Sequence, residues 1–454
     1  MKISNGFILL SLLGAVTANS HHNRFRNHQL KRQNTSSGSS STSSSSSSTT
    51  SGSSSSSSSL SKGTTGTGGT FDHIPNSSDI PIGSILPGQN LSGKTMNMPT
   101  TASPGQVPFS GAPPLPSSSP SVSEYPEMDA IPPVDHPFVQ EWISQIDWTK
   151  VPDWSQTKDG SCDSDPDLVK EADASQRCWW TCGGCTADDD LVSCPNKYDW
   201  GLSYDDGPSP YSTTLLNYLA QQKVTSTFFI VGSRALSRPD MLRAELVLGH
   251  QLSVHTWSHP YLTTLTNEEL VAELGWTKKI IQEVTGLTPN TMRPPYGDMD
   301  NRVREVCRQM SLTPIIWTTG KDSSGKSFAF DTNDWKIAGG DVSSNKSLET
   351  FEKILDSSKD IDTGFIVLQH DLYQQSVELA VAYVLPEATT RTPKLNLMSV
   401  IDCLQKPQTE AYIETSANNT APYEVGTNQS SAVKNTVNYI VPLLLTAVLS
   451  TYIF

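Results

Sequence analysis

The chain has 454 residues, which would fill about three domains of roughly 150 residues if all of it folded. Its 46 acidic residues outnumber its 32 basic ones, giving a net charge of −14 and a pI near 5.1, so a nucleic-acid binder with a basic patch is excluded. The hydrophobic fraction of 35% averages a polar N-terminal third and a segment from about Cys162 to Cys403 that can build one large core.

The first 18 residues are typical of a secretory signal peptide. Lys2 provides the positive start, Phe7–Leu13 is an apolar run, and Ala15–Ala18 offers small residues for cleavage. The alternative, a transmembrane anchor, would need about 20 apolar residues. We therefore expect residues 1–18 to be removed from a secreted protein.

Residues 19–124 are expected to form a glycosylated stalk and linker. Serine supplies 20 of the 27 residues from Thr35 to Ser61, which is typical of an O-glycosylated stalk. Phe71–Pro120 is rich in Pro, Ser and Gly, has no apolar period and is expected to be extended. Triplets for N-linked glycosylation begin at six positions along the chain: Asn34, Asn76, Asn90, Asn345, Asn418 and Asn428.

The C-terminal end resembles a signal for a glycosylphosphatidylinositol (GPI) anchor. Tyr439–Phe454 is an apolar tail that follows a short polar spacer and small residues around Ser430. We expect a linker at 406–430, removal of 431–454 and lipid attachment near Ser430, or slightly upstream at Gly426–Asn428. The alternative is a short tail helix that stays in place. The protein is expected to be held at the plasma membrane, the cell wall or both.

Residues 125–195 combine aromatic side chains with most of the cysteines. The segment Tyr125–Trp154, which includes Phe138 and Trp142, is expected to pack as an arm on its neighbour rather than to form a separate carbohydrate module. Five of the seven cysteines crowd into the second part of this region. The secretory signal favours disulfides over a zinc ribbon at Cys182–Cys185, and the odd number leaves one thiol free or shared.

From about Lys197 onward, short apolar runs alternate with amphipathic helical patterns. This alternation predicts an α/β fold with a parallel sheet, most simply a closed or partly closed barrel. The predicted strands are Trp200–Tyr204, Ser226–Val231, Gln251–Val254, Thr291–Arg293, Leu312–Trp317, Gly364–Gln369 and Leu395–Val400. The predicted helices are Tyr211–Gln222, Pro239–Leu248, Asn267–Thr285 with Thr266 as N-cap, Asn301–Met310, Ser347–Asp356 and Gln375–Leu385.

Polar side chains follow most of these predicted strands. Each group has a structural explanation by itself, such as a turn at the aspartate pair or a surface position for the arginine. The carboxyl ends of parallel strands meet at one edge of the fold, however, so several such groups together indicate one site. In chain order they are Asp205-Asp206-Gly207-Pro208, His255 with His259, Arg293-Pro294-Pro295-Tyr296, Asp331-Thr332-Asn333-Asp334-Trp335 and Leu368-Gln369-His370.

These five groups, in this order, resemble the five motifs of the polysaccharide deacetylase family (carbohydrate esterase family 4, with its NodB-homology domain). The resemblance covers roughly Asn196 to Gln405, so we place a catalytic domain at 196–405. Tyr204 departs mildly from the family, in which phenylalanine is frequent at this position. The Ser-rich stalk and anchor signal add a likeness to fungal chitin deacetylases. The resemblance implies a distorted (β/α) barrel of the NodB type.

The resemblance also implies a metal-assisted hydrolysis of an N-acetyl amide. Asp206, His255 and His259 would bind one divalent ion, Zn²⁺ in preference to Co²⁺. Two imidazoles and a carboxylate with open positions are the ligands that a hydrolytic zinc site uses. Asp205 would be the general base for the attacking water, and Arg293 would hold Asp205 by a charge-assisted hydrogen bond.

The remaining motif residues would act on the substrate side. His370 would be the general acid that protonates the leaving amine, with Asp331 orienting its ring. The backbone N–H of Tyr296 would stabilise the oxyanion. Trp335 and Leu368 would form the walls of a small pocket for the acetyl methyl group.

The expected function is removal of N-acetyl groups from chitin or chitin oligomers at the cell wall, which gives chitosan and acetate. Within the enzyme class, the alternative is an esterase acting on acetylated xylan. From another class, the alternative is a wall mannoprotein whose barrel is only a scaffold or lectin. The complete set of catalytic groups disfavours that last interpretation. The sequence implies no protein partner.

Overall fold

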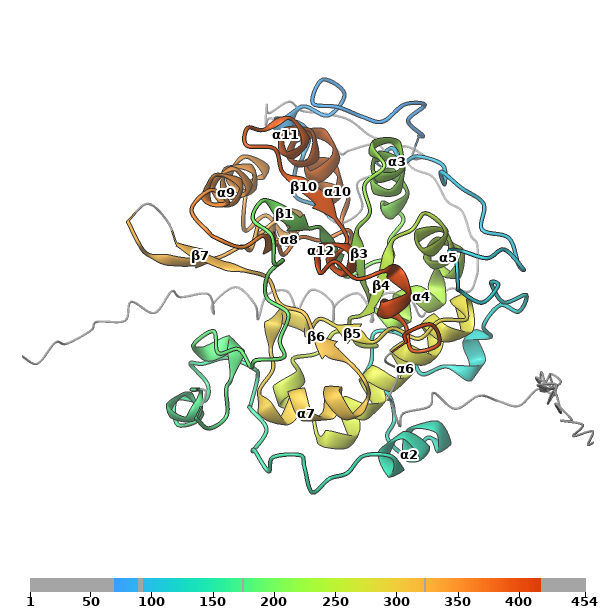
Figure 1. Cartoon of the computed structure of the whole chain (residues 1–454), viewed down its shortest axis with the longest axis vertical. Coiled ribbons are helices and arrows are strands. Elements are labelled where there is room, and N and C mark those ends of the chain that lie inside the picture. The colour runs from blue at the N-terminus through green and yellow to red at the C-terminus, as the bar shows by residue number, and fades with distance from the viewer. Residues whose placement is uncertain (1–68, 89–92, 174, 322–323, 418–454) are drawn as a thin grey trace, which may run out of the picture.

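A computed structural model describes residues 69–88, 93–173, 175–321 and 324–417 (Figure 1). The predicted signal peptide at 1–18, the removed segment at 431–454, the anchor residue Ser430 and the glycosylation sites Asn34, Asn90, Asn418 and Asn428 lie outside these residues. The other two predicted acceptors, Asn76 and Asn345, are exposed. No helix in these ranges combines the length and the apolar character needed to cross a bilayer.

The centre of the molecule is a barrel of short parallel strands. One sheet has the order β2-β3-β4-β5-β6 and a second has the order β10-β1-β9, all parallel. The backbone N–H of Thr318, just after β6, donates to Ile366 O (3.0 Å) in β9, which brings the last strand of the first sheet against the second. The strands are β1 (Asp199–Gly201), β2 (Ser203–Asp205), β3 (Thr227–Ile230), β4 (Gln251–Val254), β5 (Thr291–Met292), β6 (Thr313–Pro314), β9 (Phe365–Ile366) and β10 (Asn396–Met398).

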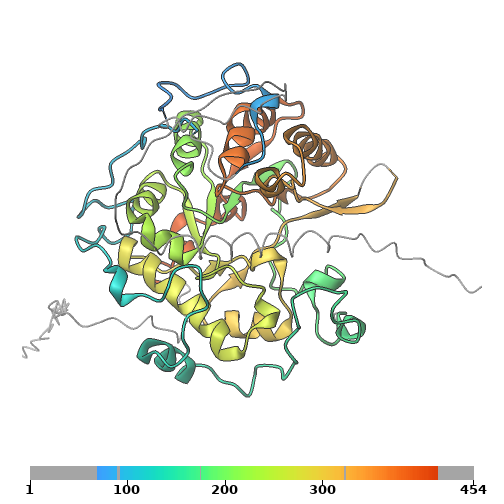
Figure 2. The same ribbon diagram turned by 180° about the vertical axis from the view of Figure 1, so that it is seen from behind.

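Helices surround this barrel on its outside (Figures 1 and 2). They are α2 (Pro137–Ser144), α3 (Ser212–Gln222), α4 (Gly232–Ser237), α5 (Pro239–Val247), α6 (Asn267–Thr285), α7 (Asn301–Gln309), α8 (Trp335–Gly339), α9 (Ser344–Ser357), α10 (Gln374–Leu379), the π-helix η7 (Ala380–Val384), α11 (Leu385–Thr390) and α12 (Val400–Cys403). Short 3₁₀ turns are η1 (Ile82–Ser84), η2 (Val122–Glu124), η3 (Leu168–Glu171), η4 (Trp180–Cys182), η5 (Leu262–Thr264), η6 (Pro295–Gly297) and η8 (Gln408–Ala411). A two-stranded antiparallel hairpin, β7 (Thr319–Lys321) with β8 (Ser327–Ala329), projects from one side.

The α/β barrel predicted from the alternating pattern is confirmed. Six of the seven predicted runs each contain one strand. The remaining run, Trp200–Tyr204, is predicted as one strand but overlaps two, β1 and β2, which belong to different sheets. The α6 helix has the predicted bounds. Its N-terminus is a capping box, in which the Thr266 hydroxyl accepts from Glu269 N–H (3.1 Å) and the Glu269 carboxylate accepts from Thr266 N–H (2.8 Å). In β3 all four residues are buried, which is consistent with the consecutive apolar residues Phe228, Phe229 and Ile230 in the sequence.

The N-terminal strap, which we define as residues 69–88 and 93–124, differs from the expected stalk and linker. It packs on the barrel, with Ile80, Ile85 and Leu115 all buried. Its carbonyls accept hydrogen bonds from the helices, for example Ile80 O from the Tyr383 hydroxyl (2.8 Å). The prediction that residues 19–124 are a linker is therefore wrong for this part. The few apolar anchors of the strap are irregularly spaced, so they give no periodic signal.

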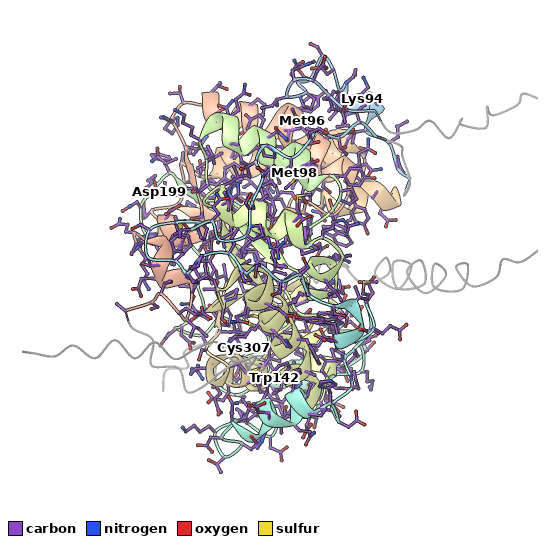
Figure 3. All side chains as sticks on the ribbon, turned by 90° about the vertical axis from the view of Figure 1, so that its right-hand side faces the viewer. Lys94, Met96, Met98, Trp142, Asp199 and Cys307 are labelled. Carbon is purple, nitrogen blue, oxygen red and sulfur yellow. A yellow bond between two sulfur atoms is a disulfide. The ribbon has the colours of Figure 1, made fainter. Side chains whose placement is uncertain are left out.

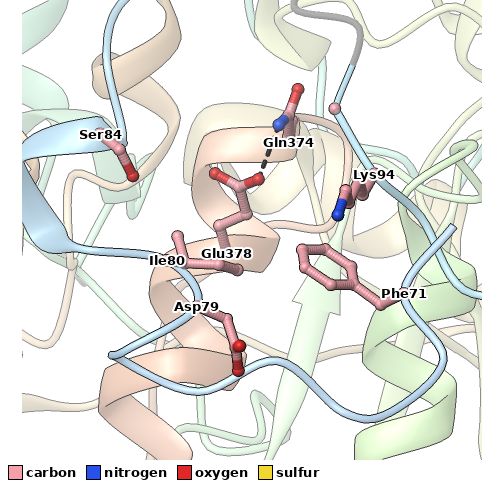
Figure 4. A pocket seen from close by; sticks show the side chains of 8 residues that line it. Phe71, Asp79, Ile80, Ser84, Lys94, Gln374 and Glu378 are labelled. Carbon is pink, nitrogen blue, oxygen red and sulfur yellow. Dashed lines mark hydrogen bonds between the residues drawn. The ribbon is translucent and has the colours of Figure 1, made fainter. Parts of the chain in front are cut away.

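A cavity of 320 Å³ lies between the strap and α10 (Figure 4). The Gln374 amide donates to the Glu378 carboxylate across one wall (2.6 Å), and burial raises the pKa of Glu378. None of the residues predicted to form the active site lines this cavity. The lining residues are Phe71, Asp79, Ile80, Ser84, Gly93, Lys94, Gln374 and Glu378.

The segment 125–195 lies against the barrel as an arm. In α2, Trp142 is fully buried and meets the Trp276 ring of α6 edge to face, with centroids 5.5 Å apart. Figure 3 places Trp142 and Cys307 toward the end of the molecule opposite Lys94, Met96 and Met98 of the strap. The arm thus covers one end of the fold, and this part of the strap lies toward the opposite end.

Six of the seven cysteines form disulfides. The pairs are Cys162–Cys182, Cys178–Cys185 and Cys194–Cys403, and the last joins the start of the barrel to its final helix. The odd cysteine is Cys307, which is buried in α7 with its pKa raised to about 12 by that burial. The disulfide interpretation is confirmed, and the zinc ribbon at Cys182–Cys185 is wrong because both thiols are bonded to other cysteines.

Replacing Trp142 with alanine tests whether the arm belongs to the folded unit. We expect Trp142→Ala to lower the free energy of unfolding by about 3–5 kcal/mol, because it removes a fully buried aromatic side chain. The matched control is Ile131→Ala in the same arm, whose side chain is exposed and should contribute little. Chemical denaturation of both variants measures the difference, and equal midpoints would mean that the arm is only tethered.

Candidate active site

The two adjacent aspartates, at the end of β2 and directly after it, point to different partners. Asp205 forms an isolated parallel bridge with His370, and Asp205 N–H donates to Gln369 O (2.9 Å). Asp206 has a left-handed backbone (φ 74°), which turns its side chain away from the strand direction. Both side chains are buried, so the barrel holds two carboxylates at one strand end and separates their roles.

The histidine pair lies in the tight loop after β4. Nε2 of His255 lies 3.3 Å from Asp206 Oδ1, and Nε2 of His259 lies 3.0 Å from the same oxygen. These three side chains form the one cluster in the described residues whose ligand atoms are close enough to hold a metal ion, all within 4.8 Å of one another. The predicted ligand set is thus brought together in space.

The chemistry of this cluster fits a cation. The Nδ1 atom of His255 lies 2.7 Å from Arg293 O, and since a carbonyl can only accept, Nδ1 carries the proton and Nε2 presents a lone pair. Asp206 Oδ1 is buried and has no hydrogen-bond partner among the described residues. Burial alone would raise the pKa of Asp206, but His259, His255 and His370 outweigh it and hold that pKa well below its ordinary value. The carboxylate is therefore ionised, and its Oδ1 lies between the Nε2 atoms of the two histidines.

Arg293, which directly follows β5, holds Asp205 by an ion pair. Its Nη1 donates to Asp205 Oδ1 (2.6 Å) and to the Ser203 hydroxyl (3.1 Å), and its Nε donates to Ile315 O (3.2 Å). The guanidinium is fully buried and stacks over the Phe229 ring at 3.9 Å. A buried charge pair with this many partners fixes the Asp205 side chain in one orientation.

His370 is held by Asp334 and not by Asp331. The Nδ1–H of His370 donates to Asp334 Oδ1 (2.7 Å), and its backbone N–H donates to Asp334 Oδ2 (2.9 Å). Burial opposes the charged form, but Asp334 together with Asp206 and Asp205 raises the pKa of His370 to about 10. These carboxylates favour the protonated form of the ring.

The prediction that Asp331 orients His370 is thus wrong in this structure. Asp331 pairs through its backbone with Leu368, and its carboxylate turns back to accept from Asn333 N–H (2.8 Å). Asp334, three residues later, is the N-cap of α8 and projects toward the adjacent strand. The sequence offers two carboxylates three residues apart, and only their backbone placement decides between them.

The three predicted substrate-binding residues lie around this site. Tyr296 has φ 60°, is 38% exposed and stacks on Tyr261 with ring centroids 3.9 Å apart. Its ring also meets the His259 ring edge to face (4.7 Å). Trp335 begins α8 directly after Asp334, and the backbone of Leu368 pairs with the Thr332 segment. Each of the three therefore lies next to a site residue: Tyr296 contacts His259, Trp335 follows Asp334, and Leu368 lies two residues before His370.

Sequence reasoning missed two further side chains that contact the site. Arg234 of α4 donates to Asp206 O (2.7 Å) and so supports the left-handed backbone of that ligand. Glu273 of α6 accepts hydrogen bonds from the loop between the two histidines. Neither lies in a motif, and one arginine or glutamate on an amphipathic helix gives no signal that distinguishes it from a solvent-facing residue.

Known proteins share much of this sequence. The polysaccharide deacetylase family model matches residues 193–315, which include the two aspartates, the histidine pair and Arg293. Chitin deacetylase 1 of Cryptococcus neoformans is 50% identical over 348 residues, 76% of this chain and 73% of that protein. Chitin deacetylase 1 of Saccharomyces cerevisiae is 31% identical and covers 57% of this chain and 76% of that protein.

Among solved structures, the chitin deacetylase from the fungal pathogen Colletotrichum lindemuthianum aligns with a TM-score of 0.43 at 25% identity, over 49% of this chain and 94% of that one. The family assignment rests on the sequence relatives, which match over most of their length. With half of the aligned residues identical to the Cryptococcus protein, the chain belongs to the polysaccharide deacetylase family, as a relative of the fungal chitin deacetylases.

Proposed function

We propose that this protein hydrolyses the N-acetyl amide of N-acetylglucosamine units in chitin, releasing acetate and leaving chitosan. The observation that carries the proposal is one cluster, Asp206 with His255 and His259. It lies near the Asp205 carboxylate, which Arg293 holds, and near the His370 imidazole, which Asp334 holds. The high identity to a chitin deacetylase supports chitin as the substrate.

The cluster would hold one divalent ion through Asp206, His255 and His259. Two imidazole nitrogens and one carboxylate oxygen suit Zn²⁺, and Co²⁺ accepts the same ligands. When bound, the ion would act as a Lewis acid that polarises the amide carbonyl.

Asp205 is the proposed general base. Its carboxylate lies 3.9 Å from His255 Nε2, so it borders the cluster without belonging to it. It takes one proton from the attacking water as the new C–O bond forms. Arg293 keeps the carboxylate oriented for this transfer.

His370 is the proposed general acid. An amine is a poor leaving group, so the C–N bond breaks when the leaving nitrogen receives a proton, which His370 supplies from its Nε2 side because Nδ1 is bonded to Asp334. The backbone N–H of Tyr296 is the proposed donor to the oxyanion, and Trp335 with Leu368 would shape the methyl pocket. Asp205 and His370 then exchange the transferred protons with solvent and return to their starting states.

We further propose that the protein acts outside the cell. Three disulfides are typical of an oxidising compartment. The proposed secretory signal and GPI anchor would hold the enzyme at the plasma membrane or wall, next to the chitin. Release of the protein from intact cells by a phosphatidylinositol-specific phospholipase would test the anchor.

Acetate release is the direct test of the function. The full chain, loaded with Zn²⁺ or Co²⁺, is incubated with chitin oligomers and with acetylated xylan, each with and without a chelator. We expect chelator-sensitive acetate release from the oligomers, with mass spectrometry showing loss of one acetyl group per step. Release from xylan alone would favour the esterase, and no release from either would contradict the proposal.

A further inference from the structure

The loop that joins the two histidines has an unusual backbone. Thr256 and His259 both have left-handed φ values, 65° and 63°, which residues with side chains adopt at an energetic cost. Within the loop, His259 N–H donates to the Thr256 hydroxyl (3.0 Å). The direction in which each imidazole points depends on this backbone, so something must hold the loop in its strained shape.

Glu273 holds the middle of this loop from outside. It lies on α6, fully buried, and its Oε2 accepts from Trp257 N–H (2.7 Å) and Ser258 N–H (2.8 Å). Its Oε1 accepts from the Ser258 hydroxyl. One carboxylate therefore binds three donors, all from the residues between the two metal ligands.

The hydrogen bonds from the loop compensate for the burial of the Glu273 carboxyl group. Burial raises the pKa of its carboxyl to about 7, and the hydrogen bonds from Ser258 and Trp257 oppose that rise. The Trp257 ring is also fully buried and stacks on Tyr125 of the arm (5.8 Å). The loop is thus fixed to α6 by Glu273 and to the arm by Trp257.

We propose that Glu273 is a positioning residue for His255 and His259, which orients both ligands for the divalent ion by clamping residues 257 and 258. The inference rests on the metal site of the proposed function but not on the substrate. It predicts that a change at Glu273 weakens metal binding although Glu273 touches no ligand atom.

Metal affinity measured on the full chain tests this inference. Co²⁺ is the probe, because its visible absorption reports coordination geometry without any substrate. We expect Glu273→Ala to weaken Co²⁺ binding by about 10- to 100-fold, the usual range for residues that support metal ligands, and to change the absorption spectrum. Glu273→Gln should recover most of the affinity, because its amide oxygen can still accept from both backbone N–H groups.

The matched control is Glu245→Gln on the neighbouring helix α5. Glu245 is equally buried, but neither of its carboxylate oxygens has a hydrogen-bond partner among the described residues. Its replacement should leave Co²⁺ affinity unchanged. If Glu273→Ala does not fold, Ser258→Ala removes one clamp contact from a partly exposed residue and should lower the affinity several-fold.

The outcomes separate this inference from the proposed function. Unchanged Co²⁺ affinity and spectrum in Glu273→Ala, or in Ser258→Ala where that is the variant available, would overturn the clamp. Failure of the wild-type protein to bind Co²⁺ would overturn the metal site itself. Normal Co²⁺ binding without acetate release from chitin oligomers would leave the clamp standing and contradict only the substrate.

Discussion

Asp205→Asn is expected to reduce turnover on chitin oligomers by about 10²- to 10⁴-fold while the protein keeps its metal. The amide of asparagine cannot take a proton from the attacking water, and a positioned base contributes a factor of this size. Asp205 is not one of the three clustered ligands, and its Oδ1 is engaged by Arg293. The measurement is acetate release, compared with the metal content from elemental analysis of the same sample.

The control for this prediction is His255→Ala, which should lose both activity and metal because it removes a ligand. Asp205→Asn also leaves the buried Arg293 without its counter-charge, which costs about 3–5 kcal/mol of stability. The melting temperature must therefore show that the variant is folded at the assay temperature. A folded, metal-loaded Asp205→Asn protein that retains wild-type turnover would contradict the assignment of Asp205 as base.

The barrel was predictable because each strand and helix is marked by a short sequence pattern, and these patterns recur along the chain. Strands such as Phe228–Ile230 are buried on both faces and therefore consist of consecutive apolar residues, and the α6 helix carries its own start signal at Thr266 and Glu269. The strap has neither feature. It binds through isolated anchors such as Ile80 and through backbone carbonyls, and no pattern in the sequence marks a carbonyl that will find a partner.

In the site, too, some residues could be predicted from the sequence and others could not. Asp206 and His255 directly follow parallel strands, and His259 lies in the same loop as His255, so the sheet topology brings all three to one edge of the fold. Glu273 reaches the site from the middle of a helix, and its role depends on how α6 packs against the loop. The sequence does not distinguish Asp331 from Asp334, because the folded backbone pairs Asp331 with Leu368 and places the Asp334 carboxylate against His370. Sequence reasoning thus found the residues whose position follows from topology and missed those whose position follows from packing.

Asp334→Asn is expected to lower activity and to move the alkaline limb of the pH profile to lower pH. The general acid must be protonated, so activity falls as pH rises through the pKa of His370, which Asp334 and its neighbours raise to about 10. A bound cation would bring this limb down in wild type and variant alike. Burial lowers the pKa of His370, and the Asp334 charge opposes that effect. Without this charge the pKa falls, so the alkaline limb should move down by about 1 to 3 pH units.

The dependence of kcat/KM on pH measures this shift, and Asp331→Asn is the matched control. Asp331 is also a carboxyl near His370, but its side chain accepts from Asn333 N–H and makes no hydrogen bond to the ring, so its removal should move the limb much less. The comparison decides which aspartate orients the acid. A larger shift in Asp331→Asn than in Asp334→Asn would contradict the role of Asp334. It would mean that Asp331, although it makes no hydrogen bond to the ring, is the aspartate that supports His370 as the acid.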